Sequence, residues 1–191
     1  MVDVRDYLAR EKLTDGTEVT VRAIRPDDGS AILEAFKALD AESIYRRFFS
    51  PKKELSDAEL KQLTDVDFES VMALVVTALE SDVEVLLGGG RLAIEGGDQP
   101  QSAELAFLTM GAHRGRGVAS LLLRHLTRLG REAGLSHLEA EVLGENQAML
   151  NVFRRSGLPL EQRREGSVVH VTLALRDPSI APRGAGIRTS P

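Results

Sequence analysis

The sequence predicts a mixed α/β domain with antiparallel strands in its first half. Short helices and then a run of strand-length apolar segments fill the first part of the chain, and the last part alternates helix with strand. Of the 191 residues, 42% are hydrophobic and 28% are charged, which is ordinary for a globular protein. A chain of this length can bury a core without disulfides or metal ions.

One strand and three short helices are expected before residue 70. Residues 17–24 alternate branched apolar and polar side chains, which indicates a strand. Pro26 and the two aspartates after it are typical of a helix start, and apolar residues follow at helical spacing. Residues 42–49 predict a second helix, and the capping-box pattern Ser56-x-x-Glu59 begins a third.

Three apolar segments in the middle of the chain predict strands at residues 71–79, 83–94 and 103–110. Three consecutive glycines interrupt the second of these strands. The stretch from Gly88 to Ala93 has the form G-x-G-x-x-A, but no helix follows it. We therefore interpret it as a bulged or flexible strand rather than a phosphate loop. Residues 96–98 predict the turn that ends the strand.

A helix, a strand, a second helix and a final strand are expected in the rest of the chain. Between residues 118 and 133 apolar side chains fall on one helical face, and Gly134 ends this helix. Residues 137–143 predict a strand, residues 146–155 a helix, and residues 168–175 the last strand.

Composition and charge exclude several classes of function. The chain has no cysteine, which removes disulfide scaffolds, thiolate zinc sites, iron–sulfur clusters and cysteine nucleophiles. Its 4 histidines do not pair at metal-site spacing, so no metal is expected. A net charge of -5 argues against nucleic acid and anionic membranes as partners. The charged N-terminal sequence does not resemble a signal peptide, and a cytoplasmic protein is expected.

The glycine-rich segment from Arg114 to Ala119, RGRGVA, lies between a predicted strand and a predicted helix. The first turn of a helix has unpaired N–H donors and the positive end of the macrodipole. Glycines let the backbone approach an anion and two arginines add positive charge, so the segment predicts a pyrophosphate site. One alternative is a tight turn that needs glycine only for its dihedral angles. The other is a dinucleotide site with Glu141 as the ribose-binding acid, although Ser120 stands where a third glycine belongs.

At these residues the sequence resembles the GNAT superfamily of acetyl-coenzyme A-dependent N-acetyltransferases. The phosphate loop of that family reads Gln/Arg-x-x-Gly-x-Gly/Ala, which Arg114 to Ala119 matches, and residues 146–158 resemble its Asn-helix-Gly-Phe segment. Residues 103–119 (AELAFLTMGAHRGRGVA) are similar to the catalytic domain of bacterial Pat-type protein lysine acetyltransferases, as are the segments EVLGENQAML, VRAIRPDD, AESIYRRFF and TDVDFESVMALV.

The resemblance covers about residues 14–175, which is the expected N-acetyltransferase domain, and it implies the GNAT acyl-CoA N-acyltransferase fold. That fold is a central, mostly antiparallel sheet, splayed at the cofactor site, with helices on both faces. Residues 1–13 are expected to form an N-terminal extension. Residues 176–191 lack periodicity and are rich in proline, glycine and small side chains, which predicts a flexible tail.

The resemblance also implies a cosubstrate, an acceptor and a set of site residues. The cosubstrate is acetyl-CoA, whose pantetheine arm would insert beside a strand as an extra strand does. The implied cofactor-binding residues are Phe107, Leu108 and Thr109 through their backbone, Arg114, Gly115, Arg116, Gly117, Val118 and Ala119 around the pyrophosphate, and Asn146 near the thioester. The acceptor is a primary amine, with a protein lysine as the first choice. The alternatives are a small-molecule amine and a non-catalytic coenzyme A-binding regulatory module.

Glu104 is the expected catalytic residue. A lysine amine has a pKa of about 10.4 and needs a base before it can attack a thioester. The Pat-type pattern places its proposed catalytic glutamate here, and the apolar neighbours of Glu104 predict partial desolvation, which would raise the pKa of the carboxyl group. The alternative is a strand glutamate that faces solvent. Phe153 stands where many family members have a tyrosine that protonates the leaving thiolate, so the thiolate is expected to leave unaided or to take its proton from water.

Overall fold

The apolar segments in the middle of the chain form the centre of one large sheet. A computed structural model describes residues 4–48, 52–94 and 102–175. The strands are β1 (Leu8–Lys12), β2 (Glu18–Ala23), β3 (Val71–Glu80), β4 (Val83–Ile94), β5 (Ser102–Thr109), β6 (His137–Leu143), β7 (Leu160–Glu165) and β8 (Val168–Ala174). They lie in the order β1-β2-β3-β4-β5-β6-β8-β7. The β5–β6 pair is parallel, and the other neighbouring strands are antiparallel.

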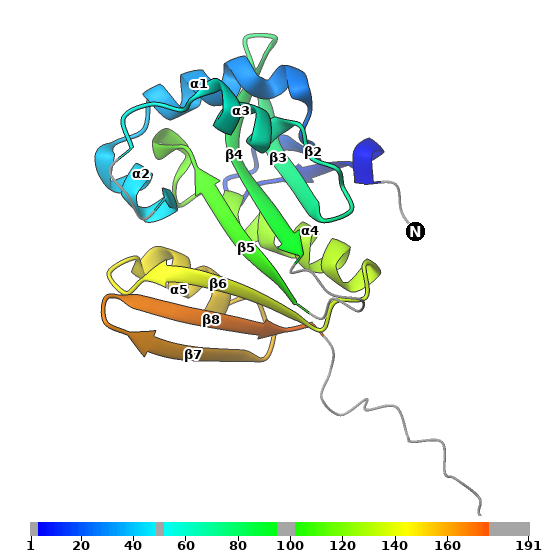
Figure 1. The fold of residues 1–191 in the computed structure, drawn as a ribbon. Helices are drawn as coiled ribbons and strands as arrows, with labels where there is room; N and C mark the ends of the chain where they lie inside the picture. Colours follow the sequence, from blue (N-terminus) through cyan, green and yellow to red (C-terminus); the bar gives the residue numbers. More distant parts are fainter. Residues whose placement is uncertain (1–3, 49–51, 95–101, 176–191) are drawn as a thin grey trace, which may run out of the picture.

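Helices cover both faces of this sheet (Figure 1). They are α1 (Gly29–Lys37), α2 (Ala41–Phe48), α3 (Asp57–Thr64), α4 (Val118–Glu132) and α5 (Gln147–Arg154), with short 3-10 turns at Val4–Asp6, Pro26–Asp28 and Gly111–His113. The α4 and α5 helices share the large core with the inner strands. The α1 and α3 helices lie at the other face, near β2, β3 and β4. This arrangement is the expected splayed α/β sheet with helices on both faces.

The β3 strand shows why its sequence is apolar almost without interruption. Met72, Leu74 and Val76 enter the large core on the α4 side, while Ala73 and Val75 enter a smaller core on the α1 side. Because side chains alternate between the two faces of a strand, a strand that is covered on both faces needs apolar residues at every position. The sequence-based prediction of a buried strand here is confirmed.

The glycine-rich stretch of β4 is a bulged strand, as the sequence predicts. Gly88 pairs with Val76 while Leu86 pairs with Thr77, so Leu87 is an extra residue in this strand. A Cβ atom on Gly88 would lie 2.7 Å from the Leu108 carbonyl oxygen and 2.8 Å from a Val118 methyl group. The missing side chain therefore allows the start of α4 to pack directly on β4 and β5.

The other predicted strands and helices are also found, with ends that differ by a few residues. The capping box at Ser56 and Glu59 is formed, and Asn146 is the N-cap of α5. Two strands were not predicted. One is β7, and the other is β1, which lies within the expected N-terminal extension, residues 1–13, and pairs with β2 along its whole length. The predicted turn at residues 96–98 and the tail, residues 176–191, lie outside the described residues.

Candidate active site

The two central strands β5 and β6 separate after a short parallel contact. In the described part of the chain they pair over three positions, the last of which joins Glu104 to Glu139. On its other side, β5 stays paired with β4 as far as Thr109. Figure 1 shows the resulting fork, in which β5 and β6 lie together at their beginnings and then diverge. Beyond Glu104, the backbone groups on the β6 side of β5 are therefore able to pair with another extended chain.

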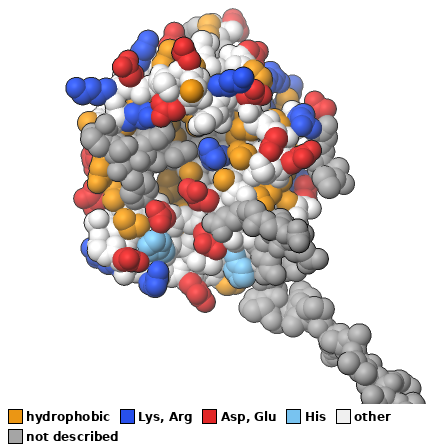
Figure 2. All heavy atoms as spheres, viewed as in Figure 1, with side chains coloured by type: hydrophobic (Ala, Val, Ile, Leu, Met, Phe, Trp, Pro, Cys, Tyr) orange, Lys and Arg blue, Asp and Glu red, His pale blue; other side chains and the backbone are white. Residues whose placement is uncertain are grey.

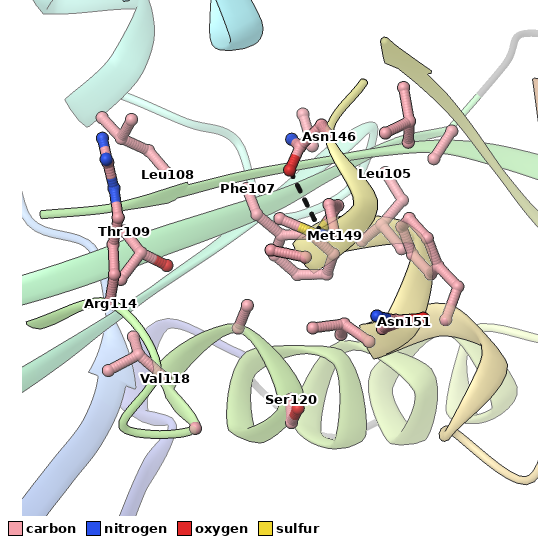
Figure 3. A pocket seen from close by; sticks show the side chains of 18 of the residues that line it. Leu105, Phe107, Leu108, Thr109, Arg114, Val118, Ser120, Asn146, Met149 and Asn151 are labelled. Atoms are coloured by element: carbon pink, nitrogen blue, oxygen red, sulfur yellow. Dashed lines mark hydrogen bonds between the residues drawn. The ribbon is translucent and has the colours of Figure 1, made fainter. Parts of the chain in front are cut away.

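A cavity of about 630 Å³ occupies this fork. Its walls come from β5, β6, the glycine-rich loop, the first turn of α4 and one face of α5 (Figure 3). Glu104 and Leu108 belong to one face of the sheet and Leu105 and Phe107 to the other, and all four line the cavity. The opening therefore reaches both faces of the sheet.

Nearly all of the predicted site residues meet at this cavity. Those that line it are Glu104, Phe107, Leu108, Thr109, Arg114, Gly115, Gly117, Val118, Ala119 and Asn146. Figure 3 shows Leu108, Thr109 and Arg114 at one end of the cavity, and Asn146, Met149 and Asn151 at the other. The predicted residue that is missing from the lining is Arg116.

The glycine-rich loop delivers the beginning of α4 to the cavity. Gly115 and Gly117 have φ angles of 74° and 93°, in the left-handed region that glycine adopts without strain. Gly117 is the N-cap residue, and its carbonyl accepts the first α-helical bond of α4, from the N–H of Leu121. Val118, Ala119 and Ser120 lie between Gly117 and Leu121. Their N–H groups belong to the first turn of the helix, where no helix carbonyl precedes them to accept a hydrogen bond. These residues line the cavity, so the positive end of a 15-residue helix faces it.

The two arginines of the loop differ in direction, which the sequence did not predict. Arg114 lines the cavity, and its Nη2 atom lies 2.9 Å from Oδ2 of Asp40, between α1 and α2. The guanidinium of Arg116 points away from the cavity to the turn between β1 and β2, where its Nε atom lies 2.6 Å from Oδ2 of Asp15. His113 is also held there, since its Nδ1 atom accepts a hydrogen bond from Arg116.

Glu104 lies at the base of the fork and is exposed. The expected desolvation of this residue by its apolar neighbours is wrong, because Ala103 and Leu105 point into the core while Glu104 points to the opposite face. The alternation of side chains along β5 thus sets the direction of Glu104, as expected for a strand glutamate that faces solvent. The same direction places the carboxylate at the cavity, so Glu104 is both exposed and part of the cavity lining.

The α5 helix supplies part of the site that sequence reasoning missed. Asn146 caps α5, and its Oδ1 atom accepts a hydrogen bond of 3.2 Å from the N–H of Met149 (Figure 3). Further lining residues are Ala148, Met149, Asn151, Val152 and Arg155. Apart from Met149, these residues follow the spacing i, i+3, i+4, i+7, which is the signal that would have shown one helix face.

Phe153 closes the cavity from the core side. It is only 1% exposed, and its ring centroid lies 6.1 Å from that of Phe107. Phe153 lines the cavity, but its ring has no group that can give a proton to a leaving thiolate. Among the described residues, no group of three or more histidines, aspartates and glutamates is placed to hold a metal ion. No helix in the same part of the chain has the length and apolar character that a membrane crossing requires.

Comparison with known proteins points to a single family. The model of the acetyltransferase (GNAT) family matches residues 38–158. Acetyltransferase PA5475 from Pseudomonas aeruginosa is 30% identical over 142 residues, which cover 73% of this chain and 74% of that protein. The acetyltransferase Pat from Mycolicibacterium smegmatis is 30% identical over 137 residues, which cover 72% of this chain but 40% of that longer protein.

A solved structure agrees with these matches. The GNAT domain of S. lividans PAT is 32% identical and superimposes with a TM-score of 0.80, covering 87% of this chain and 96% of that one. The family model spans more than half of the chain, and the fork, the glycine-rich loop and the start of α4 lie at the places that the resemblance implied. The chain therefore belongs to the acetyltransferase (GNAT) family.

Proposed function

We propose that this protein transfers the acetyl group of acetyl-CoA to a primary amine, and that the amine is the side chain of a protein lysine. The observation that carries the proposal is that one cavity joins the fork between β5 and β6 to the glycine-rich loop at the start of α4. The fork offers backbone groups to an extended arm, and the helix start offers N–H groups to a diphosphate. The fork and the helix start are adjacent in the cavity, as the pantetheine arm and the diphosphate are adjacent in coenzyme A.

The donor would lie along β5. Its diphosphate would bind at the first turn of α4, with the guanidinium of Arg114 beside it. Its pantetheine arm would pair with the backbone of Phe107 to Thr109, toward the thioester end near Glu104. Five residue steps separate Thr109 from Glu104, which is roughly 16 Å along a strand at about 3.3 Å per residue. The base is therefore remote from the diphosphate and close to the reacting end of an extended donor.

Glu104 would accept the proton of the attacking amine, directly or through water. The amine nitrogen then forms a bond with the thioester carbon, and the carbon–sulfur bond breaks to release the thiolate of coenzyme A. Phe153 cannot protonate this thiolate, so the proton comes from water. A thiol has a pKa of about 8.5, so the thiolate is a tolerable leaving group near neutral pH.

The acceptor would approach from the face of the sheet that carries Glu104. On that face, Glu141 of β6 is exposed and lines the cavity. Figure 2 shows further acidic side chains over the part of this face formed by β6, β7 and β8. Negative charge next to the base favours a cationic acceptor such as lysine. The resemblance of residues 103–119 to Pat-type protein lysine acetyltransferases supports a protein as the carrier of that lysine.

Incubation with acetyl-labelled acetyl-CoA and a cell lysate, followed by separation by size, tests the proposal. We expect the label in the protein fraction, on lysine side chains. Label in the small-molecule fraction would replace the protein acceptor by a small amine, and slow hydrolysis without any labelled acceptor would indicate a coenzyme A-binding module. Titration of the protein with acetyl-CoA in a calorimeter tests the donor, and no heat at millimolar donor would overturn the whole proposal.

The role of Glu104 is tested by Glu104→Gln, with Glu139→Gln as the matched control. Both are exposed glutamates, and they are paired neighbours on β5 and β6, but Glu139 does not line the cavity. Loss of a general base lowers turnover by about 100- to 10,000-fold. We expect a loss of that order for Glu104→Gln with unchanged donor affinity, and near-normal turnover for Glu139→Gln. Normal turnover of Glu104→Gln would show that another group is the base.

A further inference from the structure

The turn between β1 and β2 contacts the glycine-rich loop, and its residue Thr14 also lines the cavity. This turn is closed by hydrogen bonds from the Leu13 N–H to the Thr17 carbonyl and from the Gly16 N–H to the Leu13 carbonyl. The N–H and the hydroxyl of Thr14 donate to the carbonyl of Arg116 at 3.3 and 3.0 Å. The Thr14 methyl carbon lies 3.2 Å from the position that a Cβ atom on Gly117 would take.

The side chain of Arg116 completes this contact. Its Nε atom donates to Oδ2 of Asp15 at 2.6 Å, and its Nη2 atom donates to the Thr17 hydroxyl at 2.7 Å. Its Nη1 atom donates to Nδ1 of His113 at 2.8 Å. All three nitrogens of the guanidinium are thus engaged within the protein, and two of them reach residues about a hundred positions earlier in the chain.

Asp15 is itself fixed in place. Its Oδ1 atom accepts a hydrogen bond of 3.0 Å from the N–H of Thr17, which leaves Oδ2 for Arg116. The hydrogen bond from the Thr17 backbone, together with those from the Thr17 hydroxyl and Arg116, holds the pKa of Asp15 well below its usual range. The carboxylate therefore stays charged throughout the pH range in which an acetyltransferase would be assayed.

A loop of this composition needs such support. A glycine-rich segment has more backbone freedom in the unbound state than other segments, so ordering it around a ligand has a large entropic cost. A Cβ atom on Gly115 would meet no atom within 4 Å, so that residue has no packing of its own. A contact that fixes the loop before the ligand arrives removes part of this cost and raises affinity.

We propose that Arg116 and Asp15 form a clamp that presets the glycine-rich loop for the diphosphate of coenzyme A without touching it. Arg116 is then a positioning residue, and the N-terminal strand pair is part of the donor site. Arg114 is the arginine that meets the diphosphate. This inference rests on the proposed function, because it assumes that coenzyme A is the ligand of the loop.

Removal of the Asp15 charge distinguishes the clamp from direct contact. If Arg116 bound the diphosphate itself, Asp15→Asn would leave the dissociation constant of coenzyme A unchanged or lower it, because a nearby negative charge is lost. A clamp predicts the opposite, an increase of roughly tenfold, as for the loss of a hydrogen bond between charged groups. The matched control is Glu18→Gln, which removes the same charge from the same strand pair, where Glu18 contacts Lys12 rather than the loop.

Two variants of Arg116 sharpen the test. Arg116→Lys keeps the charge but loses the planar guanidinium that binds Asp15 and Thr17 at once. A clamp therefore predicts that the affinity for coenzyme A falls nearly as much as in Arg116→Gln. Direct contact with phosphate predicts that lysine preserves affinity. In a clamp, the double variant Asp15→Asn/Arg116→Gln should bind no more weakly than Arg116→Gln alone, because both changes remove one interaction.

Calorimetric titration with coenzyme A gives the dissociation constants, and steady-state kinetics give a second measure. We expect KM for acetyl-CoA to rise while kcat at saturating donor stays the same, because Glu104 is untouched. Amide hydrogen exchange without ligand should be faster at residues 115–119 in Asp15→Asn than in the parent protein or in Glu18→Gln. Exchange at the core strand β3 of the same variant separates this local effect from a loss of global stability. Unchanged affinity and unchanged exchange in Asp15→Asn would overturn the clamp alone, whereas a parent protein that does not bind coenzyme A overturns the proposed function.

Discussion

Gly88 shows at the scale of one residue how the fork and the helix depend on each other. Its neighbours on two sides are the Leu108 backbone, which belongs to the predicted donor wall, and the Val118 side chain at the start of α4. A methyl group would collide with a backbone oxygen on one side and with a branched side chain on the other. Neither neighbour can move without disturbing the cavity, so this position links stability to ligand binding.

We expect Gly88→Ala to lower both stability and donor affinity. Overpacking of a tight site costs about 1–3 kcal/mol of the free energy of unfolding. Gly111→Ala is the control, since a Cβ atom there would meet nothing within 4 Å and its φ angle is not positive. An exposed change of this kind shifts stability by less than about 0.5 kcal/mol. Urea unfolding and calorimetry with coenzyme A measure both effects, and equal stability of the two variants would contradict the packing argument.

At the scale of elements, a buried polar chain fastens the first strand to α4. The Nδ1 atom of His125 lies 2.5 Å from the Tyr7 hydroxyl, and its Nε2 atom lies 3.1 Å from Oε1 of Glu11. Because a carboxylate only accepts, Nε2 carries the proton and Nδ1 accepts from tyrosine. The His125 side chain is 8% exposed. This chain joins residues just before and within β1 to the middle of α4.

This contact makes stability depend on pH. Burial lowers the pKa of His125, and the positive charges of Arg124 and Arg128 act in the same direction, while Glu11 opposes them. The unfolded chain, with a histidine pKa of about 6.5, therefore takes up the proton first as the pH falls. The contribution of His125 is fully present above that pH and is lost as the pH falls toward the lower folded pKa.

We expect the free energy of unfolding to decrease between pH 7.5 and pH 5.5, and to decrease less in His125→Gln. His137→Gln is the control, because His137 is an exposed histidine of β6 that takes no part in the contact of His125 with Tyr7 and Glu11. Urea unfolding at the two pH values measures the slope. A slope that is the same in His125→Gln and in the parent protein would show that this histidine does not set it.

At the scale of the whole molecule, the sequence predicted what apolar patterns and local motifs encode. The strands at residues 71–79 and 103–110 were predicted because their side chains fill the core. The β1 and β7 strands, LAREK and LEQRRE, contain mainly charged side chains and join the sheet at its two edges by backbone pairing, so their hydrophobic pattern carries no signal.

In the site, too, local sequence patterns predicted only the local features. The glycine-rich loop and the helix start are local features of about six residues, and they were predicted as they are found. The direction of the Arg116 side chain was not predicted, because its partners Asp15 and Thr17 are brought to it by the fold. Likewise, the face that α5 presents to the cavity depends on how this helix packs against α4 and β5.

The domain boundary at residue 175 remains a prediction, and truncation tests it. Leu175 is in the core, its N–H donates to the Ser136 carbonyl at 2.7 Å, and its carbonyl accepts from Arg131 at 2.9 Å. We expect a chain that ends at Leu175 to keep the unfolding midpoint and the donor affinity of the full chain. A chain that ends at Ser167 lacks β8, which pairs with both β6 and β7, and should not fold. A lower unfolding midpoint for the chain that ends at Leu175 would show that the domain extends beyond residue 175.

Among the described strands, the early separation of β5 and β6 leaves an unpaired interior edge on each of these two strands, in addition to the two outer edges of the sheet. Edge strands of a β-sheet can pair with strands of other proteins, and charged residues such as those of β1 and β7 make this pairing unfavourable. The interior edges lie inside the sheet, on either side of the cavity of about 630 Å³. A slender molecule with amide groups along its length can pair there with the backbone of β5 beyond Glu104.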